Sequence, residues 1–395
     1  MKTPHIIHVT AYYPPHLGGQ EIAVQDLATQ LALAGEQVEV VTSSVGARTG
    51  VGVENGVLVT RLKSYEFAHT AIIWGLFFWL LRHTRRNTIV HLHVGQFFTS
   101  EVVWLAAKIK RFRYILHLHC DLVQSGPLGR LLPLYKKLFF DREINDAEVV
   151  IVLTKEHCRA VRRDHGYDGK LLVTHNGIGE DFFKITRKPA GPKTLKLLYV
   201  GRLSPHKNLA ALLEALSTIE HRTELDIIGD GECRRELEML VAEQKLENVR
   251  FHGRLSRDEV KKFYGTCSAL ILPSLYEVQP LTLLESMAAR IPIIVSERIG
   301  IEVEAREAVL IEPTAQGIAS GIERFAAMTP DARDLLADAA FERAEKHRWH
   351  ALIGFYIDLY DGMAEYTQSL RRSLRWSGRN GGGAGQRHGT DADAF

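Results

Sequence analysis

Two glutamates in the stretch Pro273–Pro292 have a spacing that could serve a ligand-binding site. Glu277 and Glu285 lie eight residues apart, and Pro280 stands between them. Proline is well tolerated in the first turn of a helix, so a helix is expected to begin there. The residues after Pro280 have helix-forming composition, which puts Glu285 one turn beyond Leu281 on the same helix face.

The start of this expected helix could hold an anion. A helix N-terminus leaves backbone N–H groups without partners, here those of Leu281 and Thr282, and it favours negative charge. The segment could therefore present amides to a phosphate, with Glu277 and Glu285 nearby. The alternative is that both glutamates are ordinary solvated residues flanking a core helix. Other motifs must decide between these interpretations.

Two cations occur at a second strand–helix junction. The segment GRLSPHKN begins at Gly201, directly after an apolar strand-like run, and contains Arg202 and Lys207. Together with the helix N-terminus at Leu281, these two side chains could hold a diphosphate.

A dinucleotide site is the competing interpretation of this half of the chain. Gly229 and Gly231 have the spacing that begins the motif GxGxxG, but Arg234 stands where the third glycine is needed. The loop also lies in the middle of the chain and not after the first strand. A nicotinamide or flavin enzyme is therefore disfavoured.

A pair of glycines marks the first ligand loop of the N-terminal half. Gly18 and Gly19 follow a strand-like segment at His5–Val9 and precede apolar residues at helical spacing. This order of strand, glycine loop and helix is typical of a doubly wound α/β domain, in which ligands bind at the carboxyl ends of the strands. The glycines would let the backbone approach a ligand closely.

Two later strands each end in a His-x-His pair, His91 with His93 and His117 with His119. Alternate residues of a strand point to the same side, so a metal cluster is conceivable. Carboxylate or cysteine ligands at short spacing are missing, however, and imidazoles often serve as hydrogen-bonding groups at strand ends. The more informative motif is HLHCD, which puts His119 and Asp121 at the expected ligand edge.

The elements that must position these residues form two α/β series. A segment with linker composition, 184–193, separates them and predicts an N-terminal domain over 1–186 and a C-terminal domain over 187–370. The glycine-rich, polar segment 371–395 is expected to be a disordered tail.

Composition excludes several classes of protein. The 395 residues carry a net charge of +2 with dispersed basic residues, which gives no support for nucleic acid binding. Four widely spaced cysteines suggest neither a zinc site nor a disulfide framework. The N-terminus lacks the apolar core of a signal peptide, and the longest apolar run, 71–81, is too short to span a bilayer. A cytoplasmic protein is expected.

Taken in order, these motifs resemble those of the retaining, nucleotide-sugar-dependent glycosyltransferases of family 4. The resemblance covers about residues 5–365 and rests on PPHLGGQE, HLHCD, HNGI, GRLSPHKNL, IIGDGE and PSLYEVQPLTLLESMAARIP. It implies two facing Rossmann-like domains, the GT-B architecture, with the last helix packing back on the N-terminal domain. Each motif is modest alone, but their order and spacing are specific, and they favour the ligand-binding interpretation of the two glutamates.

The resemblance also assigns roles at the donor site. It implies that Glu285 accepts hydrogen bonds from the ribose hydroxyls and that Glu277 contacts the transferred sugar, with the amides of Leu281 and Thr282 near sugar and phosphates. The loop that begins at Gly201 should bind the diphosphate through Arg202 and Lys207, the two cations named above.

Two further roles and one departure follow from the same resemblance. Gly18 and Gly19 should close over the donor from the other domain, and His119 matches a histidine near the sugar and the acceptor. The family usually has glycine before the Ile291-Pro292 pair, where Arg290 stands here. Arg290 must either tolerate a positive φ or mark a changed helix end.

The function implied is transfer of a hexosyl unit from a nucleotide-diphosphate sugar, the co-substrate, to a glycan or lipid-linked acceptor in bacterial cell-surface polysaccharide or glycolipid synthesis. The lysine, arginine and helix dipole would offset the charge of the leaving group, so no metal and no other cofactor are expected. The alternative is a nucleotide-sugar epimerase on the same fold, which would change the donor sugar without any acceptor.

The aromatic, basic stretch 71–86 leaves two interpretations open. Residues 71–81, AIIWGLFFWLL, could form a core helix of the first domain that ends in a solvated basic turn. They could instead lie at the inner face of a membrane, with Arg82, Arg85 and Arg86 against anionic headgroups. The nearly continuous apolar character argues for burial without saying against what.

Overall fold

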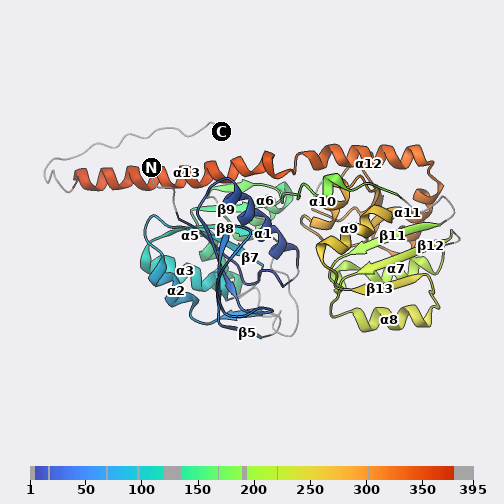
Figure 1. Ribbon diagram of the computed structural model, residues 1–395, viewed down its shortest axis with the longest axis horizontal. Helices are drawn as coiled ribbons and strands as arrows, with labels where there is room; N and C mark the ends of the chain where they lie inside the picture. Colours follow the sequence, from blue (N-terminus) through green and yellow to red (C-terminus); the bar gives the residue numbers. More distant parts are fainter. Residues whose placement is uncertain are drawn as a thin grey trace.

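The computed structural model describes most of the chain, with the side chains of 365–377 excepted: 5–16, 18–67, 70–95, 98–119, 135–167, 169–188, 194–219, 221–300 and 303–377. The chain forms two lobes, each built on a largely parallel sheet that helices cover (Figure 1). The prediction of an α/β protein with two Rossmann-like domains is confirmed.

The first sheet has eight strands in the order β10-β9-β8-β7-β1-β2-β4-β3. All neighbours are parallel except β3 and β4. The strands are β1 Ile6–Val9, β2 Val38–Ser43, β3 Gly50–Glu54, β4 Val57–Leu62, β7 Ile89–Val94, β8 Arg113–Leu118, β9 Val149–Val152 and β10 Leu171–Val173. A separate hairpin joins β5 Ser64–Phe67 to β6 Thr70–Ile73. The chain order reverses between β1 and β7.

The second sheet has six parallel strands in the order β13-β12-β11-β14-β15-β16. They are β11 Leu195–Val200, β12 Thr223–Ile228, β13 Val249–Gly253, β14 Ala269–Leu272, β15 Ile293–Ser296 and β16 Val309–Ile311. The chain order reverses between β11 and β14. Such a reversal opens a crevice at the carboxyl edge of a parallel sheet, so each domain offers one place for a ligand.

Helices cover both faces of the sheets. They are α1 Gly19–Leu33, α2 Leu76–His83, α3 Thr99–Lys110, α5 Asp141–Asp146, α6 Lys155–His165, α7 Leu209–Leu216, α8 Arg234–Glu243, α9 Arg257–Thr266, α10 Leu281–Ala288, α11 Ala315–Ala327, α12 Pro330–Glu345 and α13 Trp349–Ser377. The buried apolar side chains described in the first domain form two large clusters, one on each face of its sheet, and a small cluster of Ala11, Tyr12 and Ala71.

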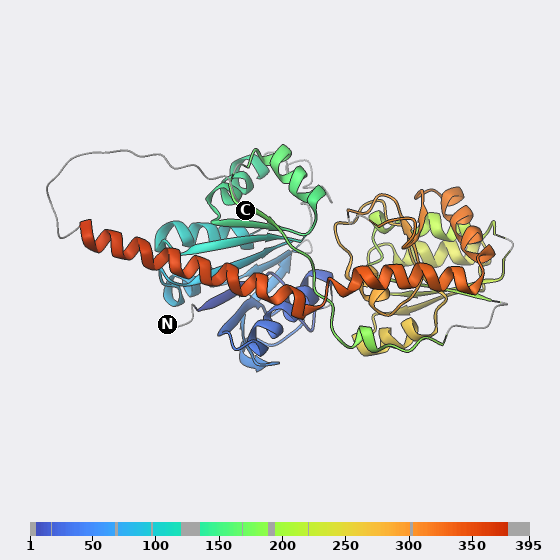
Figure 2. The ribbon, with the colours of Figure 1, turned by 90° about the horizontal axis from the view of Figure 1, so that it is seen from above.

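The last two helices connect the domains. Figure 2 shows α12 along the second domain and α13 along the first. Trp349, Tyr356 and Tyr360 of α13 are buried in the same cluster as apolar residues of α1. The C-terminal helix therefore packs back on the N-terminal domain.

The crossing from the first domain to the second lies earlier than residue 187 when judged by packing. Ile178 and Phe182 are buried in the core of the second domain, while β10 of the first sheet ends at Val173. The composition of 184–193 locates a polar stretch, but the core of the second domain begins before it.

Two expected boundaries change in the structure. The helix expected from Ala71 begins only at Leu76, because Gly75 has φ 78° and Ala71–Ile73 belong to strand β6. Helix α13 continues to Ser377, beyond the expected end at 370, and includes Gly354 and Gly362 in its interior. The remainder of the expected tail lies outside the described residues.

Arg290 tolerates the turn in which the resemblance led us to expect glycine. Its φ is 53°, and the N–H of Ile291 donates to the carbonyl of Ser286 at 2.9 Å, which closes the end of α10. The guanidinium pairs with Asp338 and lies 3.7 Å above the ring of Phe341. These contacts offset the strain of a positive φ at a residue with a side chain.

Candidate active site

The reversal point of the second sheet brings two of the predicted loops together. Lys207 follows β11 and Glu277 follows β14, and these strands are neighbours. The N–H of Leu275 donates to the carbonyl of His206 at 2.8 Å, which fastens one loop to the other. Two segments 70 residues apart in sequence therefore share one edge of the sheet.

Lys207 and Glu277 form an ion pair at this edge. Their side chains are 17% and 11% exposed, and the hydroxyl of Ser274 donates to Oε1 of the same carboxylate at 2.9 Å. A lysine ammonium has three N–H donors, so Lys207 can keep this pair and still donate to an anion. The pair holds a cation at the crevice in a defined position.

Arg202 lies in a different environment. Its Nε donates to Glu232 at 3.0 Å, and its side chain is 54% exposed. The structure therefore brings Lys207 and Glu277 together but pairs Arg202 with the GDGE loop. Gly201, one residue earlier, directly follows β11. A Cβ there would lie 2.8 Å from the hydroxyl of Tyr199, which donates to the carbonyl of Arg202 at 2.9 Å.

The two glycines of the GDGE loop are explained by packing. A Cβ at Gly229, where φ is 136°, would lie 1.9 Å from the carbonyl oxygen of Gly201. A Cβ at Gly231 would lie 2.3 Å from the carbonyl oxygen of Leu203. Only glycine allows this close approach of two loops, so the GxG spacing needs no dinucleotide to account for it.

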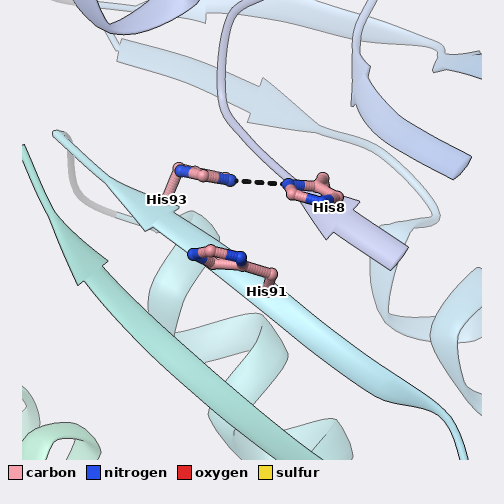
Figure 3. A group of neighbouring side chains, drawn as sticks. All are labelled: His8, His91 and His93. Atoms are coloured by element: carbon pink, nitrogen blue, oxygen red, sulfur yellow. Dashed lines mark hydrogen bonds between the residues drawn. The ribbon is translucent and has the colours of Figure 1, made fainter. Parts of the chain in front are cut away.

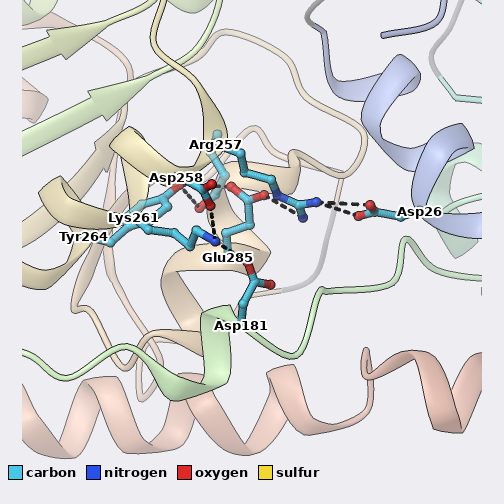
Figure 4. Close-up of polar contacts among 8 residues, drawn as sticks. Asp26, Asp181, Arg257, Asp258, Lys261, Tyr264 and Glu285 are labelled. Atoms are coloured by element: carbon cyan, nitrogen blue, oxygen red, sulfur yellow. Dashed lines mark hydrogen bonds and ion pairs between the residues drawn. The ribbon is translucent and has the colours of Figure 1, made fainter. Parts of the chain in front are cut away.

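Glu285 lies inside the second domain on α10, which begins at Leu281 after Pro280 as expected. Glu285 as a whole is 6% exposed. Oε1 lies 3.2 Å from Nη2 of Arg257, and the hydroxyl of Tyr264 donates to Oε2 at 3.2 Å (Figure 4). Burial raises the pKa of this carboxyl to about 7, and the nearby Arg257 opposes that rise.

The start of α10 is held against the first domain. Gln279, two residues before the helix, accepts from the backbone N–H of Asn176 at 2.6 Å and contacts the carbonyl of Leu153 at 3.4 Å. Leu281 is buried and Thr282 half-buried. The amides that were expected to meet a phosphate thus lie beside the junction of the two domains.

The reversal point of the first sheet holds Gly18 and Gly19. Gly19 is the first residue of α1, and the side-chain amide of Gln20 lies 3.4 Å from the carbonyl of His93. His119 follows β8 at the same edge, and its N–H lies 3.4 Å from the carbonyl of Val94. The structure therefore brings the glycine loop and His119 to one sheet edge. Asp121 lies outside the described residues.

Buried histidines line one face of this edge. His8 Nδ1 lies 2.9 Å from His93 Nε2, and His93 Nδ1 lies 2.9 Å from His119 Nε2. His91 contacts His117 at 3.1 Å and the hydroxyl of Tyr360 at 2.7 Å. Burial lowers the pKa of His8 and of His119 to about 3, so both are neutral at pH 7. The sequence pattern indicated four of these histidines but not His8.

The ring geometry opposes a shared metal ion, although ring nitrogens lie within 4.8 Å of one another in two groups, His8 with His91 and His93, and His93 with His117 and His119. The rings of His117 and His119 are stacked at 4.3 Å with an interplanar angle of 21°. The rings of His91 and His93 are stacked at 4.4 Å with an interplanar angle of 16°, as Figure 3 shows. A metal lies about 2 Å from each nitrogen in the plane of its ring, and stacked rings point their lone pairs along parallel planes. The cluster fits a hydrogen-bonded stack better.

A cavity of about 140 Å³ opens between the domains next to the Glu277 loop. Its lining comes from the start of α6 and from the loops around Tyr276 and Gly300: Thr154, Glu156, His157, Ala160, Arg163, Tyr276, Val278 and Gly300.

In the part of the chain that the structure describes, no helix has the length and apolar character needed to cross a membrane.

Sequence reasoning missed Arg257, Asp26 and Tyr264. Ser256 and Glu259 form a capping box, which makes Arg257 the first residue of α9. No local signal pairs Arg257 with Asp26, which is 231 residues away.

Fold and site together define a glycosyltransferase of the GT-B type, and comparisons with known proteins support this. Residues 18–177 match the family described as Glycosyl transferase 4-like domain, and residues 180–343 match Glycosyl transferases group 1. These two matches meet where the chain passes from the first core to the second.

Relatives of similar length carry the same class of activity in their names. The chain is 26% identical to an uncharacterized glycosyltransferase of Methanocaldococcus jannaschii, over 90% of this chain and 97% of the relative. It is 24% identical to the O-antigen chain mannosyltransferase C of Escherichia coli, over 74% and 79%.

Solved structures agree on the fold. A sucrose-phosphate synthase from Thermosynechococcus elongatus superimposes with a TM-score of 0.75 at 21% identity, covering 91% of this chain and 99% of that one. The Anabaena protein HepE, solved with UDP and glucose, gives a TM-score of 0.68 at 16% identity, covering 93% and 100%.

Proposed function

We propose that this glycosyltransferase is a family 4 enzyme. In this proposal it moves a hexosyl unit from a nucleotide-diphosphate sugar to a glycan or lipid-linked saccharide, with retention and without a metal. The observation that carries the proposal is the Lys207–Glu277 pair at the reversal point of the second sheet. Glycosyl transfer creates negative charge on the departing diphosphate, and a fixed cation stabilises that charge as it develops.

Glu277 serves the sugar in this mechanism and does not act as a nucleophile. Its Oε1 is already engaged by Lys207 and Ser274. A carboxylate held in this way is suited to accept hydrogen bonds from sugar hydroxyls. The acceptor attacks the face that the leaving group vacates, and the donor phosphate takes the acceptor proton.

The donor nucleotide is proposed to bind through its ribose hydroxyls to Glu285. Glu285→Ala should weaken binding of the nucleotide diphosphate by about 1.5–3 kcal/mol, the usual range for hydrogen bonds to a charged group. Calorimetric titration of UDP, GDP and ADP into wild type and variant measures this. Equal affinity in both proteins would reject the assignment of Glu285.

The acceptor class is supported by relatives named for cell-surface polysaccharides, among them the O-antigen chain mannosyltransferase. Incubation of donor without acceptor separates a transferase, which at most hydrolyses the donor slowly, from an epimerase, which converts its sugar. Activity should persist in EDTA, and strict dependence on added metal would contradict the electrostatic role given to Lys207.

Peripheral membrane contact through 71–86 is proposed for a lipid-linked acceptor. Helix α2 buries only Leu76 and Leu80, while Phe78 is 73% and Trp74 62% exposed. Arg82, Arg85 and Arg86, which follow on the same segment, are exposed. Exposed aromatic rings next to arginines suit an anionic headgroup region.

Flotation with liposomes that contain or lack anionic lipid tests this contact. The wild type should float only with anionic lipid, and the bound fraction should fall when Arg82, Arg85 and Arg86 are replaced by Gln. If the wild type stayed in the lower fraction, or if the variant bound as well as the wild type, membrane contact through 71–86 would be rejected.

A further inference from the structure

One arginine side chain joins the two domains at the predicted ribose site. Arg257 Nη1 donates to both carboxylate oxygens of Asp26 on α1, each at 3.0 Å. Its Nη2 lies 3.2 Å from Oε1 of Glu285 on α10. Figure 4 shows the guanidinium between the two carboxylates. A single cation thus connects the first domain with a residue of the second domain's candidate site.

The three charges are shielded from solvent. The side chain of Arg257 is 28% exposed, that of Asp26 16% and that of Glu285 8%. The guanidinium also lies 4.7 Å above the ring of Phe182. Charges buried to this degree are costly unless they are paired, so removal of one member leaves the others in an unfavourable environment.

The carboxylate of Glu285 keeps lone-pair positions for a ligand while Arg257 binds it. A carboxylate has about four lone-pair positions, and Arg257 and Tyr264 take one on each oxygen. The remaining positions match the two hydroxyls of a ribose. The existing contacts therefore fix the orientation of the carboxylate, and its remaining lone pairs can still accept hydrogen bonds from the two hydroxyls.

We propose that Arg257 is a positioning residue that holds Glu285 for the nucleotide while Asp26 holds Arg257. Nucleotide binding and the contact between the domains are then coupled through this guanidinium. The inference rests on the proposed function in one respect, namely that Glu285 binds the nucleotide. Such coupling is reciprocal: the factor by which the Asp26 contact strengthens nucleotide binding equals the factor by which nucleotide strengthens that contact.

Calorimetric titration of UDP, GDP and ADP into the full-length protein tests the coupling. Asp26→Asn keeps the shape of the side chain but removes the charge, and it should weaken binding of the preferred diphosphate about tenfold, within the usual range of coupling between sites. Arg257→Lys keeps a cation but lacks the fork that reaches both carboxylates, and it should give a similar loss.

Asp258→Asn is the matched control. Asp258 neighbours Arg257 on α9, pairs with Lys261 and has a side chain that is 87% exposed, so its variant should bind nucleotide as the wild type does. In a Glu285→Ala background, Asp26→Asn should have no further effect on affinity. A purely structural role for Asp26 would instead make the two losses additive.

Small-angle X-ray scattering with and without the diphosphate supplies the second readout. Nucleotide should narrow the distribution of interdomain distances in the wild type and should do so less in Asp26→Asn. If the wild type binds none of the three diphosphates, the proposed function itself fails. If it binds one and Asp26→Asn and Arg257→Lys bind that one equally well, the coupling is refuted while the proposed function stands.

Discussion

The carboxyl edges of the two sheets carry opposite kinds of polar side chain. The edge of the second domain is charged, with Lys207 paired to Glu277. The edge of the first domain carries imidazoles such as His93 and His119, which burial keeps neutral. The difference suits a division of labour: fixed charges meet a diphosphate, and uncharged hydrogen-bonding groups meet hydroxyls of a sugar or an acceptor.

The largest effect is expected when the charged edge loses Lys207. Lys207→Ala should lower kcat about 10²- to 10³-fold, as loss of one preorganised donor does in other active sites, and should change donor affinity less. Release of nucleotide diphosphate at saturating donor measures it. A loss confined to KM would contradict the role.

Arg202→Ala is the natural comparison for that variant. Arg202 is half exposed and paired with Glu232, so solvent already screens its charge. Its loss should lower kcat clearly less than the loss of Lys207. Equal effects would mean that the guanidinium leaves Glu232 when the donor binds.

A smaller effect is expected at the neutral edge. His93→Phe removes the middle member of the His8–His93–His119 chain and leaves the buried imidazole of His8 and the half-buried imidazole of His119 without this partner. Unfolding free energy should fall by about 1–3 kcal/mol, as it does when a buried polar group loses its partner. Urea denaturation measures this, and nucleotide affinity should stay unchanged. A loss of affinity would remove the proposed division between the two edges.

The pH dependence of nucleotide binding sharpens the comparison. Burial raises the pKa of Glu285 to about 7, and Arg257, Tyr264 and Asp26 surround it. The carboxylate form, which is proposed to accept from the ribose, is present above that pKa and lost below it. Affinity should therefore fall about tenfold from pH 8 to pH 6, relative to Glu285→Gln, which controls for ionisation of the phosphates. If the affinities of wild type and Glu285→Gln changed with pH in parallel, ionisation of Glu285 would be rejected as the cause of the pH dependence.

The smallest effect concerns a buried acid of the first domain. Burial raises the pKa of Glu143 to about 8, above its ordinary value of 4.5. The folded state thus holds this proton more tightly than the unfolded state. The stability it contributes is present below pH 4.5 and is lost as pH rises through 8. Glu143→Gln should reduce the loss of stability between pH 7 and pH 9 by about 1 kcal/mol in thermal unfolding. Identical pH profiles would contradict the raised pKa.

Much of the candidate site in the second domain could be predicted because its signals are local. Pro280 sets the start of α10, and the loops after β11 and β14 follow strands whose apolar runs are plain in the sequence. Parallel strands bring their carboxyl ends to one edge of the sheet, so the sequence alone predicts that the loops carrying Lys207 and Glu277 lie at the same edge. The start of α2 was missed because the apolar run conceals the turn at Gly75.

The sequence by itself determined the two α/β domains, the loops that reach their edges and the acids and cations those loops carry. These follow from periodicity and from residues that begin or end an element, which act over a few positions. Only the tertiary structure decided that Arg257 bridges Asp26 and Glu285, that Arg202 pairs with Glu232 and that His8 joins the histidine stack. Those contacts depend on how separate elements pack, and local sequence patterns do not specify which side chains meet across that distance.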